Sequence, residues 1–426
     1  MMKDGGVKLV VGLLMFILML SILSGCGFRR NPSEIGGLLR VKDPNALPGV
    51  SIKEFVTVKD PYCCVKPFHD DRKYDTQVVS AFDNTVVYAM GSGKVVHPPT
   101  GLVYVDHLII YDITMNRIVK KISADPGFVQ FWDTGINKNW IIWDEVDTEF
   151  NQTVKGYAMN RRTGKIKLIF SVNKNGGENS FWFGTKDKTK LKNLTFDLNE
   201  TILTGNNVYI GYNLGTKTPF SVLKSAIVSI NLNDLKKSVP VNIKVSNAGL
   251  SRFSVNENYI AFSIFGRNKQ NMFSDIYLYS FKSGKIVKFT DNNISCAPSL
   301  APDNYIVFVL RSKESMEIPP KGYDDTEYLA IALVDNPDRV KIITKSSKTD
   351  HIAISSKGRF VLLDDYENGW FVYDRKEDYL LLIKGSLLPT RPSFASDNII
   401  VGLHQKNGGF SVLNLSLLYK MLKLAN

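Results

Sequence analysis

A cysteine thiol near the N-terminus is the first group in this sequence whose surroundings indicate a specific chemistry. Cys26 follows Ser24 and Gly25, two residues small enough for a peptidase cleft. An apolar run over residues 9–20 lies upstream, preceded by two lysines. This order is typical of a secretory signal peptide, and the run is too short for an ordinary transmembrane helix. We therefore expect residues 1–25 to be removed and the rest of the chain to fold outside the cytoplasm.

The residues at 23–26, Leu-Ser-Gly-Cys, resemble the lipobox of bacterial lipoproteins. In that family the cysteine thiol carries a diacylglycerol, with fatty acyl chains such as palmitate, and cleavage leaves this cysteine as the first residue. The resemblance implies lipid attachment at Cys26, and two or more acyl chains give stable anchoring. The expected location is the extracytoplasmic face of a cell membrane: the outer surface in a single-membrane bacterium, the periplasmic side if there are two membranes. An uncleaved helix with an incidental cysteine is the alternative.

Three further cysteines, Cys63, Cys64 and Cys296, leave their redox state open. One of the adjacent pair, with Cys64 as our candidate, could form a disulfide with Cys296 and leave an odd thiol. A strained vicinal disulfide or three free thiols are the alternatives. Neither a CxxC nor an HExxH motif occurs in the sequence, so we predict no metal site and no cofactor.

The formal net charge of +12 narrows the class of partner. Lysine and arginine are scattered along the whole chain, without a run of five or six like charges. This distribution favours solubility and attraction to an anionic cell envelope. We do not expect a nucleic-acid partner.

The elements that must position any site come from a repeated phrase. Each copy has a short strand, a turn containing Asp or Asn, an apolar strand, a loop, a second apolar strand and, often after Gly-Lys, a final strand. The clearest copy has NYIAFS at 258–263, DIYLY at 275–279 and GKIVKFT at 284–290. Seven copies, about 40 to 70 residues apart, predict an all-β protein, a β-propeller of seven four-stranded blades. The copies are anchored at residues 84, 139, 207, 258, 304, 358 and 398.

The two ends of the repeat region complete this prediction. Residues 417–422 are assigned as the final strand of the last copy. Ring closure is expected to use one blade built from both chain ends, with a β-rich stretch at 52–58 as the added strand. The predicted domains are a signal peptide over 1–25, a lipid-anchored linker over 26–50 and the propeller over 51–426. A pair of β-sandwiches is the alternative fold.

The segment PSLAPDNYIVF at 298–308 resembles the TolB-type propeller repeat, usually written PxxSPDGxxIxF. RPSFASDN at 391–398 is a second match, and the resemblance extends over about residues 78–424. Asn stands where Gly is usual, which left-handed turn geometry tolerates. The resemblance implies the propeller fold and a general binding role. No GxSxG elbow for a hydrolase occurs in the sequence.

Two long insertions are the candidate binding loops, because long loops on a rigid scaffold often carry function. The first, residues 173–192, contains Phe181, Trp182 and Phe183; the second, residues 311–326, contains Tyr323. Exposed aromatic side chains are common binding anchors. The alternative is that these rings pack back onto the blades. Trp132, Trp140 and Trp143 are expected in the core.

These observations predict a membrane-anchored lipoprotein whose non-catalytic propeller binds a protein partner or an envelope polymer. The lipid at Cys26 would tie it to the membrane, and no catalytic residue is assigned. The alternative is an extracytoplasmic hydrolase or lyase acting on glycans or peptides, with carboxylates from different blades converging at the propeller channel.

Overall fold

The computed structural model describes residues 54–59 and most of 76–425. The segments outside the description between 76 and 425 are 92–94, 98–101, 104, 148–152, 174–179, 184–193, 218–219, 245–247, 269–270, 313–315, 317–326, 347–348, 366–368, 385–389 and 405–408. The predicted signal peptide and Cys26 therefore lie outside the described residues. No helix within the described part is long and apolar enough to cross a membrane.

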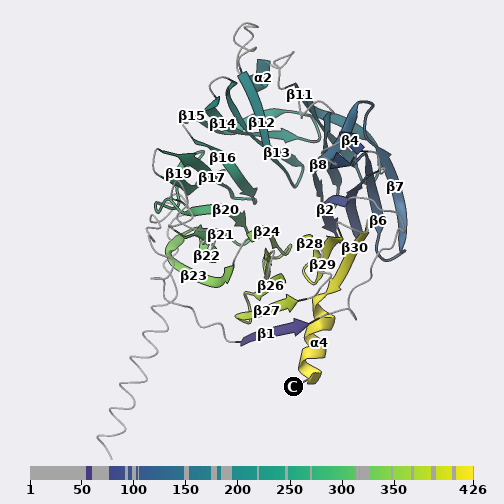
Figure 1. Cartoon of the computed structure of the whole chain (residues 1–426), viewed down its shortest axis with the longest axis vertical. Coiled ribbons are helices and arrows are strands. Elements are labelled where there is room, and N and C mark those ends of the chain that lie inside the picture. The colour runs from purple at the N-terminus through teal and green to yellow at the C-terminus, as the bar shows by residue number, and fades with distance from the viewer. Residues whose placement is uncertain are drawn as a thin grey trace, which may run out of the picture.

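Seven antiparallel sheets follow one another along the chain and form a seven-bladed β-propeller, which confirms the predicted fold. Figure 1 shows the sheets arranged around a central axis in chain order. Blade 1 consists of β2 (Thr76–Phe82), β3 (Thr85–Met90), β6 (His107–Asp112) and β7 (Arg117–Ser123). Blade 2 consists of β8 (Phe128–Ile136), β9 (Trp140–Asp147), β10 (Thr153–Asn160) and β11 (Ile166–Asn173). Blade 3 consists of β12 (Leu194–Thr204), β13 (Asn207–Lys217), β14 (Phe220–Asn231) and β15 (Lys237–Lys244).

The remaining blades repeat this up-and-down order. Blade 4 consists of β16 (Ala248–Val255), β17 (Tyr259–Arg267), β18 (Met272–Ser280) and β19 (Ile286–Lys288). Blade 5 consists of β20 (Ser295–Leu300), β21 (Tyr305–Arg311), β22 (Glu327–Leu333) and β23 (Asn336–Ser346). Blade 6 consists of β24 (Thr349–Ile354), β25 (Phe360–Asp365), β26 (Gly369–Asp374) and β27 (Tyr379–Lys384). Blade 7 has three strands, β28 (Thr390–Ser396), β29 (Ile399–His404) and β30 (Gly409–Asn414). A small hairpin of β4 (Val95–His97) and β5 (Leu102–Val103) projects from blade 1.

The second strand of a blade is buried along most of its length because both faces of the sheet are covered. In β21 the run from Ile306 to Leu310 is buried without alternation. The outer strand β7 is instead largely exposed. The described residues form seven apolar clusters, one at each interface between neighbouring blades, including the interface between blades 7 and 1. The core is therefore a ring of seven interfaces between sheets.

Ring closure differs from the expected shared blade. The N-terminal stretch does form a strand, β1 (Glu54–Lys59), but it pairs in parallel with β27 at the outer edge of blade 6. Blades 7 and 1 meet by packing, with Ala395 and Val401 against Ala81 and Tyr88. The backbone N–H of Asp83 donates to the carbonyl of Ala395 at 2.6 Å. No described strand is exchanged between these two blades.

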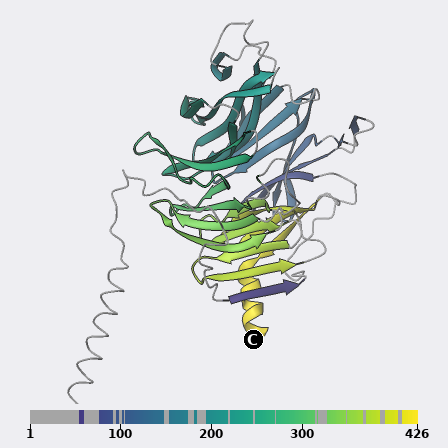
Figure 2. The same cartoon turned by 60° about the vertical axis from the view of Figure 1, so that its left-hand side comes forward.

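The last predicted strand, residues 417–422, is also wrong, because this segment belongs to the helix α4 (Leu415–Ala425). The sequence LSLLYKMLKLA contains good helix formers and no β-branched residue, so its apolar positions follow a helical face. The side chain of Asn414 accepts a hydrogen bond from the N–H of Leu417 at 3.1 Å, as an N-cap does. Leu415 and Leu418 are buried between blades 6 and 7. Figures 1 and 2 both show α4 and β1 at the same end of the molecule.

Two adjacent leucines of α4 test this packing. Leu418 is 2% exposed and Leu417 is 43% exposed. We expect Leu418→Ala to lower the free energy of unfolding by about 2–5 kcal/mol, because the truncation leaves a cavity between two blades. Leu417→Ala, the matched control, should change it by about 0.5 kcal/mol or less. Urea unfolding followed by tryptophan fluorescence measures both, and equal effects would contradict the docked helix.

Candidate functional site

The innermost strands of the seven blades form the wall of the central channel. Each innermost strand contacts the innermost strand of the next blade, and β28 contacts β2 to complete the ring. Every one of these strands contains a shift in register against its partner, in β2, β8, β12, β16, β20, β24 and β28. Such bulges redirect side chains and are common beside functional sites. The same irregularity therefore recurs in the channel wall in all seven blades.

The bulge in β20 shows how the local sequence produces this geometry. Its register shift lies between Cys296 and Ser299. Ala297 has a φ of 49°, a left-handed conformation that is unusual for a residue other than glycine. Pro298 has no N–H for the ladder, so a bulge accommodates it well. Backbone conformations of this kind often cluster where binding residues are held.

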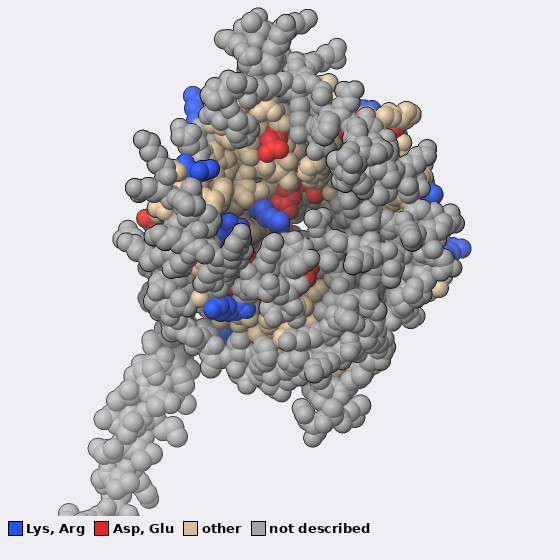
Figure 3. All heavy atoms as spheres, in the orientation of Figure 1, with Lys and Arg blue, Asp and Glu red and all other residues tan. Residues whose placement is uncertain are grey.

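A cavity of about 250 Å³ lies in the channel beside these bulges. It is bounded by the inner strands of blades 3 to 6 and by two further strands of blade 5. Figure 3 shows the hollow at the centre of this face, with side chains of both charges exposed in it. The lining residues are Glu200, Ile202, Arg252, Phe253, Ser254, Cys296, Ala297, Pro298, Ser299, Val309, Arg311, Glu327 and Ile352.

Two of the four charged lining residues form an ion pair within blade 5. Arg311 ends β21 and Glu327 begins β22, and the two residues are paired in the sheet register. The Nε atom of Arg311 lies 3.3 Å from Oε1 of Glu327. This pair stands at the base of the 311–326 insertion, which the sequence marks as a candidate binding loop.

The third charged residue, Glu200, is held with its carboxylate partly removed from water. Burial raises its pKa, and the nearby charge of Arg252 and a hydrogen bond from the N–H of Phe253 oppose this rise in part. The distance from that nitrogen to Oε2 of Glu200 is 3.4 Å. Glu200 therefore retains its proton to a higher pH than an ordinary glutamate.

The fourth charged residue, Arg252, is exposed to the cavity. Arg252 lies on β16, and Ser263 on the neighbouring β17 holds its backbone: the Ser263 hydroxyl donates to the Arg252 carbonyl at 3.3 Å and accepts from its N–H at 3.4 Å. Among the described residues, none forms a hydrogen bond or an ion pair with its guanidinium group. Arg252 consequently presents unused donors to the channel.

The one described cysteine also faces this cavity. Cys296 is buried, and no described residue forms a disulfide with it. Burial raises the pKa of its thiol to about 11, although the charge of Arg311 lowers it in part. The thiol is therefore protonated at neutral pH, and a protonated thiol is a poor nucleophile. Cys64 lies outside the described residues, so the disulfide between Cys64 and Cys296 stays a prediction.

Buried acidic groups lie on the other side of β12. Thr201 donates its hydroxyl to Asp144 Oδ2 at 2.6 Å and its N–H to Asp133 Oδ2 at 2.9 Å. Burial, together with the nearby charge of Asp133, raises the pKa of Asp144 well above its usual value. Within the described part of the chain, no group of three His, Cys, Asp or Glu side chains is placed to hold a metal ion.

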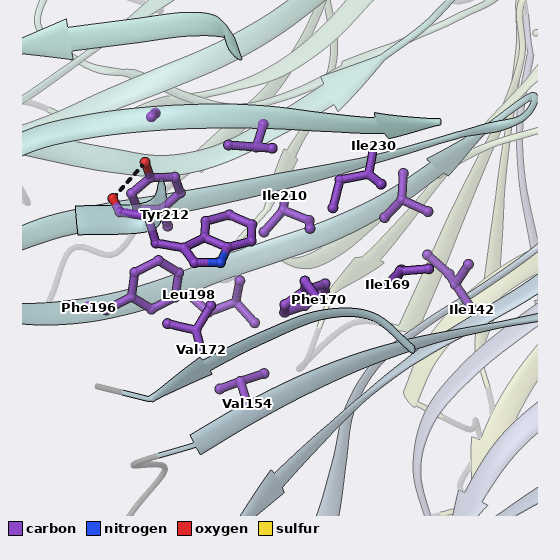
Figure 4. Close-up of a cluster of buried hydrophobic side chains, with 14 of the residues drawn as sticks. Ile142, Val154, Ile169, Phe170, Val172, Phe196, Leu198, Ile210, Tyr212 and Ile230 are labelled. Atoms are coloured by element: carbon purple, nitrogen blue, oxygen red, sulfur yellow. Dashed lines mark hydrogen bonds between the residues drawn. The ribbon is translucent and has the colours of Figure 1, made fainter. Parts of the chain in front are cut away.

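The three aromatic residues of the first predicted binding loop, Phe181, Trp182 and Phe183, are not all exposed. They lie on the short helix α2 (Ser180–Phe183) between blades 2 and 3. Trp182 is 2% exposed and packs edge-on against Phe170, Phe196 and Tyr212, so it is a core residue and not an exposed anchor. Figure 4 shows this cluster, to which both blades contribute.

Phe181 remains a candidate contact, because it is 42% exposed and Lys237 lies over its ring at 5.0 Å. The side chain of Phe183 and all of Tyr323 lie outside the described residues, so their roles stay predictions. Trp140 and Trp143 are buried as expected, whereas Trp132 is 36% exposed, which corrects its assignment to the core.

No protein-family model matches this sequence, and no curated protein matches it. Solved structures do match its fold. The β-propeller domain of the Trilobed protease from Pyrococcus furiosus, described as having an open velcro topology, is 12% identical with a TM-score of 0.52. That match covers 81% of this chain and 94% of the other. Oligogalacturonate lyase from Vibrio parahaemolyticus is 9% identical with a TM-score of 0.51, covering 82% and 96%. At these identities the likeness shows the fold alone.

The raised pKa of Glu200 predicts a pH-dependent stability. Between the ordinary pKa of glutamate and the higher folded value, the unfolded chain loses a proton that the folded chain keeps, so stability falls as pH rises. We expect Glu200→Gln to raise the free energy of unfolding at pH 7 to 8 and to have little effect near pH 4. The exposed Glu257 supplies the control, Glu257→Gln. Urea unfolding across this range measures the effect, and a gain independent of pH would refute the assignment.

Proposed function

We propose that this protein is a lipid-anchored, extracytoplasmic β-propeller that binds a ligand in its central channel without transforming it. The observation that carries this proposal is the cavity of about 250 Å³ in which Glu200, Arg252, Arg311 and Glu327 converge from three blades. Ligands usually bind in a concave site where a few polar groups converge. The ligand could be a small molecule or a projecting group of a protein partner or envelope polymer.

The character of the lining favours binding over covalent catalysis. The Cys296 thiol is protonated at neutral pH, and the Arg311 guanidinium is paired with Glu327. The apolar side chains of Ile202 and Ile352 complete the wall. Groups of this kind orient a ligand through hydrogen bonds and exclude water around it, and they supply no activated nucleophile.

In-cell photo-cross-linking tests the location of the site. A photoreactive amino acid at Ser299 lies on the cavity wall, and one at Ile118 lies on the exposed outer strand of blade 1. We expect specific adducts from the Ser299 position and none from the Ile118 position. Adducts from the Ile118 position alone would place the binding surface on the outside of the propeller and refute the channel site.

Membrane attachment has its own test. The lipobox resemblance supports a lipid on Cys26, so Cys26→Ala should prevent lipid attachment and release the protein from membranes. Detergent phase partitioning and the mass of the N-terminal peptide measure this, with Ser24→Ala as a control that keeps a small residue before the thiol. An unmodified Cys26 on the membrane-bound protein would contradict the anchor.

A glycan or peptide hydrolase or lyase is the second candidate. Two carboxylates that line the same cavity favour it. Burial raises the pKa of Glu200, whereas Glu327 is ion-paired with Arg311. Such a pair can divide the roles of general acid and general base. Product release from oligosaccharides or peptides that is lost in both Glu200→Gln and Glu327→Gln would favour this reading over simple binding.

A further inference from the structure

We propose that the ligand of the channel presents a carboxylate group and that the guanidinium of Arg252 binds it. This inference rests on the proposed binding function and specifies its ligand chemistry. Two properties of the cavity support it: the charges of its lining residues, and the hydrogen bonds and ion pairs that those residues already form.

The four charged lining residues are not equivalent. Arg311 and Glu327 form an ion pair across 3.3 Å, so their charges compensate one another, although the buried Arg311 Nε makes no hydrogen bond with the described residues. Glu200 accepts a hydrogen bond from the backbone of Phe253 and interacts with the charge of Arg252. Only the guanidinium of Arg252 has neither a hydrogen bond nor an ion pair with the described residues. The Arg252 guanidinium is therefore the group in this cavity that is available to bind a negatively charged acceptor.

The geometry of Arg252 suits a planar anion. A guanidinium offers parallel N–H groups that match the two oxygens of a carboxylate. Its main chain is fixed by Ser263 on the neighbouring strand, so the group projects from a rigid base. A doubly charged phosphate fits less well, because Glu200 and Glu327 line the same cavity and would repel the second charge.

The other residues of the cavity wall limit the size and polarity of the rest of the ligand. Ile202, Phe253, Pro298, Val309 and Ile352 give the cavity apolar surface. A volume of about 250 Å³ accommodates a unit the size of one amino-acid residue or one sugar ring. Both a peptide C-terminus and a uronic acid sugar combine a carboxylate with such a body, so their shared chemistry defines the ligand class.

Isothermal titration calorimetry on the full-length protein in detergent micelles tests the inference with two matched pairs of probes. The first pair is an acetylated dipeptide with a free C-terminal carboxylate and its C-terminal amide. The second pair is methyl glucuronoside and methyl glucoside. We expect at least one carboxylate probe to bind tenfold or more tightly than its neutral twin, and the pair that shows the preference identifies the source.

Variants then assign the preference to one side chain. Arg252→Gln should abolish it, whereas Arg267→Gln, which removes the same charge from an exposed position on β17, should retain it. Equal binding of charged and neutral probes, binding of neither pair, or an unchanged preference in Arg252→Gln would each overturn the inference. Channel adducts at Ser299 without a carboxylate preference would leave the proposed function standing and remove only this ligand class.

Discussion

The structure depends on the burial of both faces of each sheet against its neighbours. An isolated blade would expose two apolar faces, and each β-sheet face must be covered by another layer. Seven apolar clusters, one per interface, provide that cover around the whole ring. At the blade 7 to blade 1 interface the same packing, with the Asp83 to Ala395 hydrogen bond, closes the ring without strand exchange. Every blade is therefore held by interfaces on both sides.

This ring of interfaces lets the channel tolerate features that are unfavourable on their own. The left-handed Ala297 and the partly desolvated Glu200 both cost stability locally. Each lies on an inner strand whose neighbours on both sides are fixed by apolar packing. The strands thus hold polar groups at the axis with little freedom, which is what a preorganised binding site requires.

The sequence predicted the repeating part of the fold because that part is local. Turn residues and apolar strands recur within each copy, and their period identifies a propeller. The partner of β1 could not be predicted, since strand propensity does not specify which sheet edge a segment will join. The end of the chain was mispredicted because 417–422 has apolar residues but no β-branched ones, and this composition favours a helix.

The candidate site was harder to predict than the fold for a related reason. Glu200, Arg252, Cys296 and Ile352 occupy similar places in successive blades, about 50 residues apart, and no local motif connects them. Only the 311–326 insertion, chosen for its length, indicated the right region, because the residues at its two ends, Arg311 and Glu327, line the cavity. Trp182 was assigned to a binding loop because its loop is long and polar, but the adjoining blades offered an aromatic core that buries it.

The position of β1 has a consequence for how a membrane tether and a channel ligand would coexist. With a lipid on Cys26, the segment before β1 would span at most about 100 Å when extended. It would reach the propeller at the outer edge of blade 6, where β1 pairs with β27 over six residue pairs. A strand added at that edge alters none of the innermost strands that line the cavity. Attachment at the outer edge of blade 6 and binding at the axis would then use separate parts of the fold, so a lipid anchor would leave the channel accessible to a ligand.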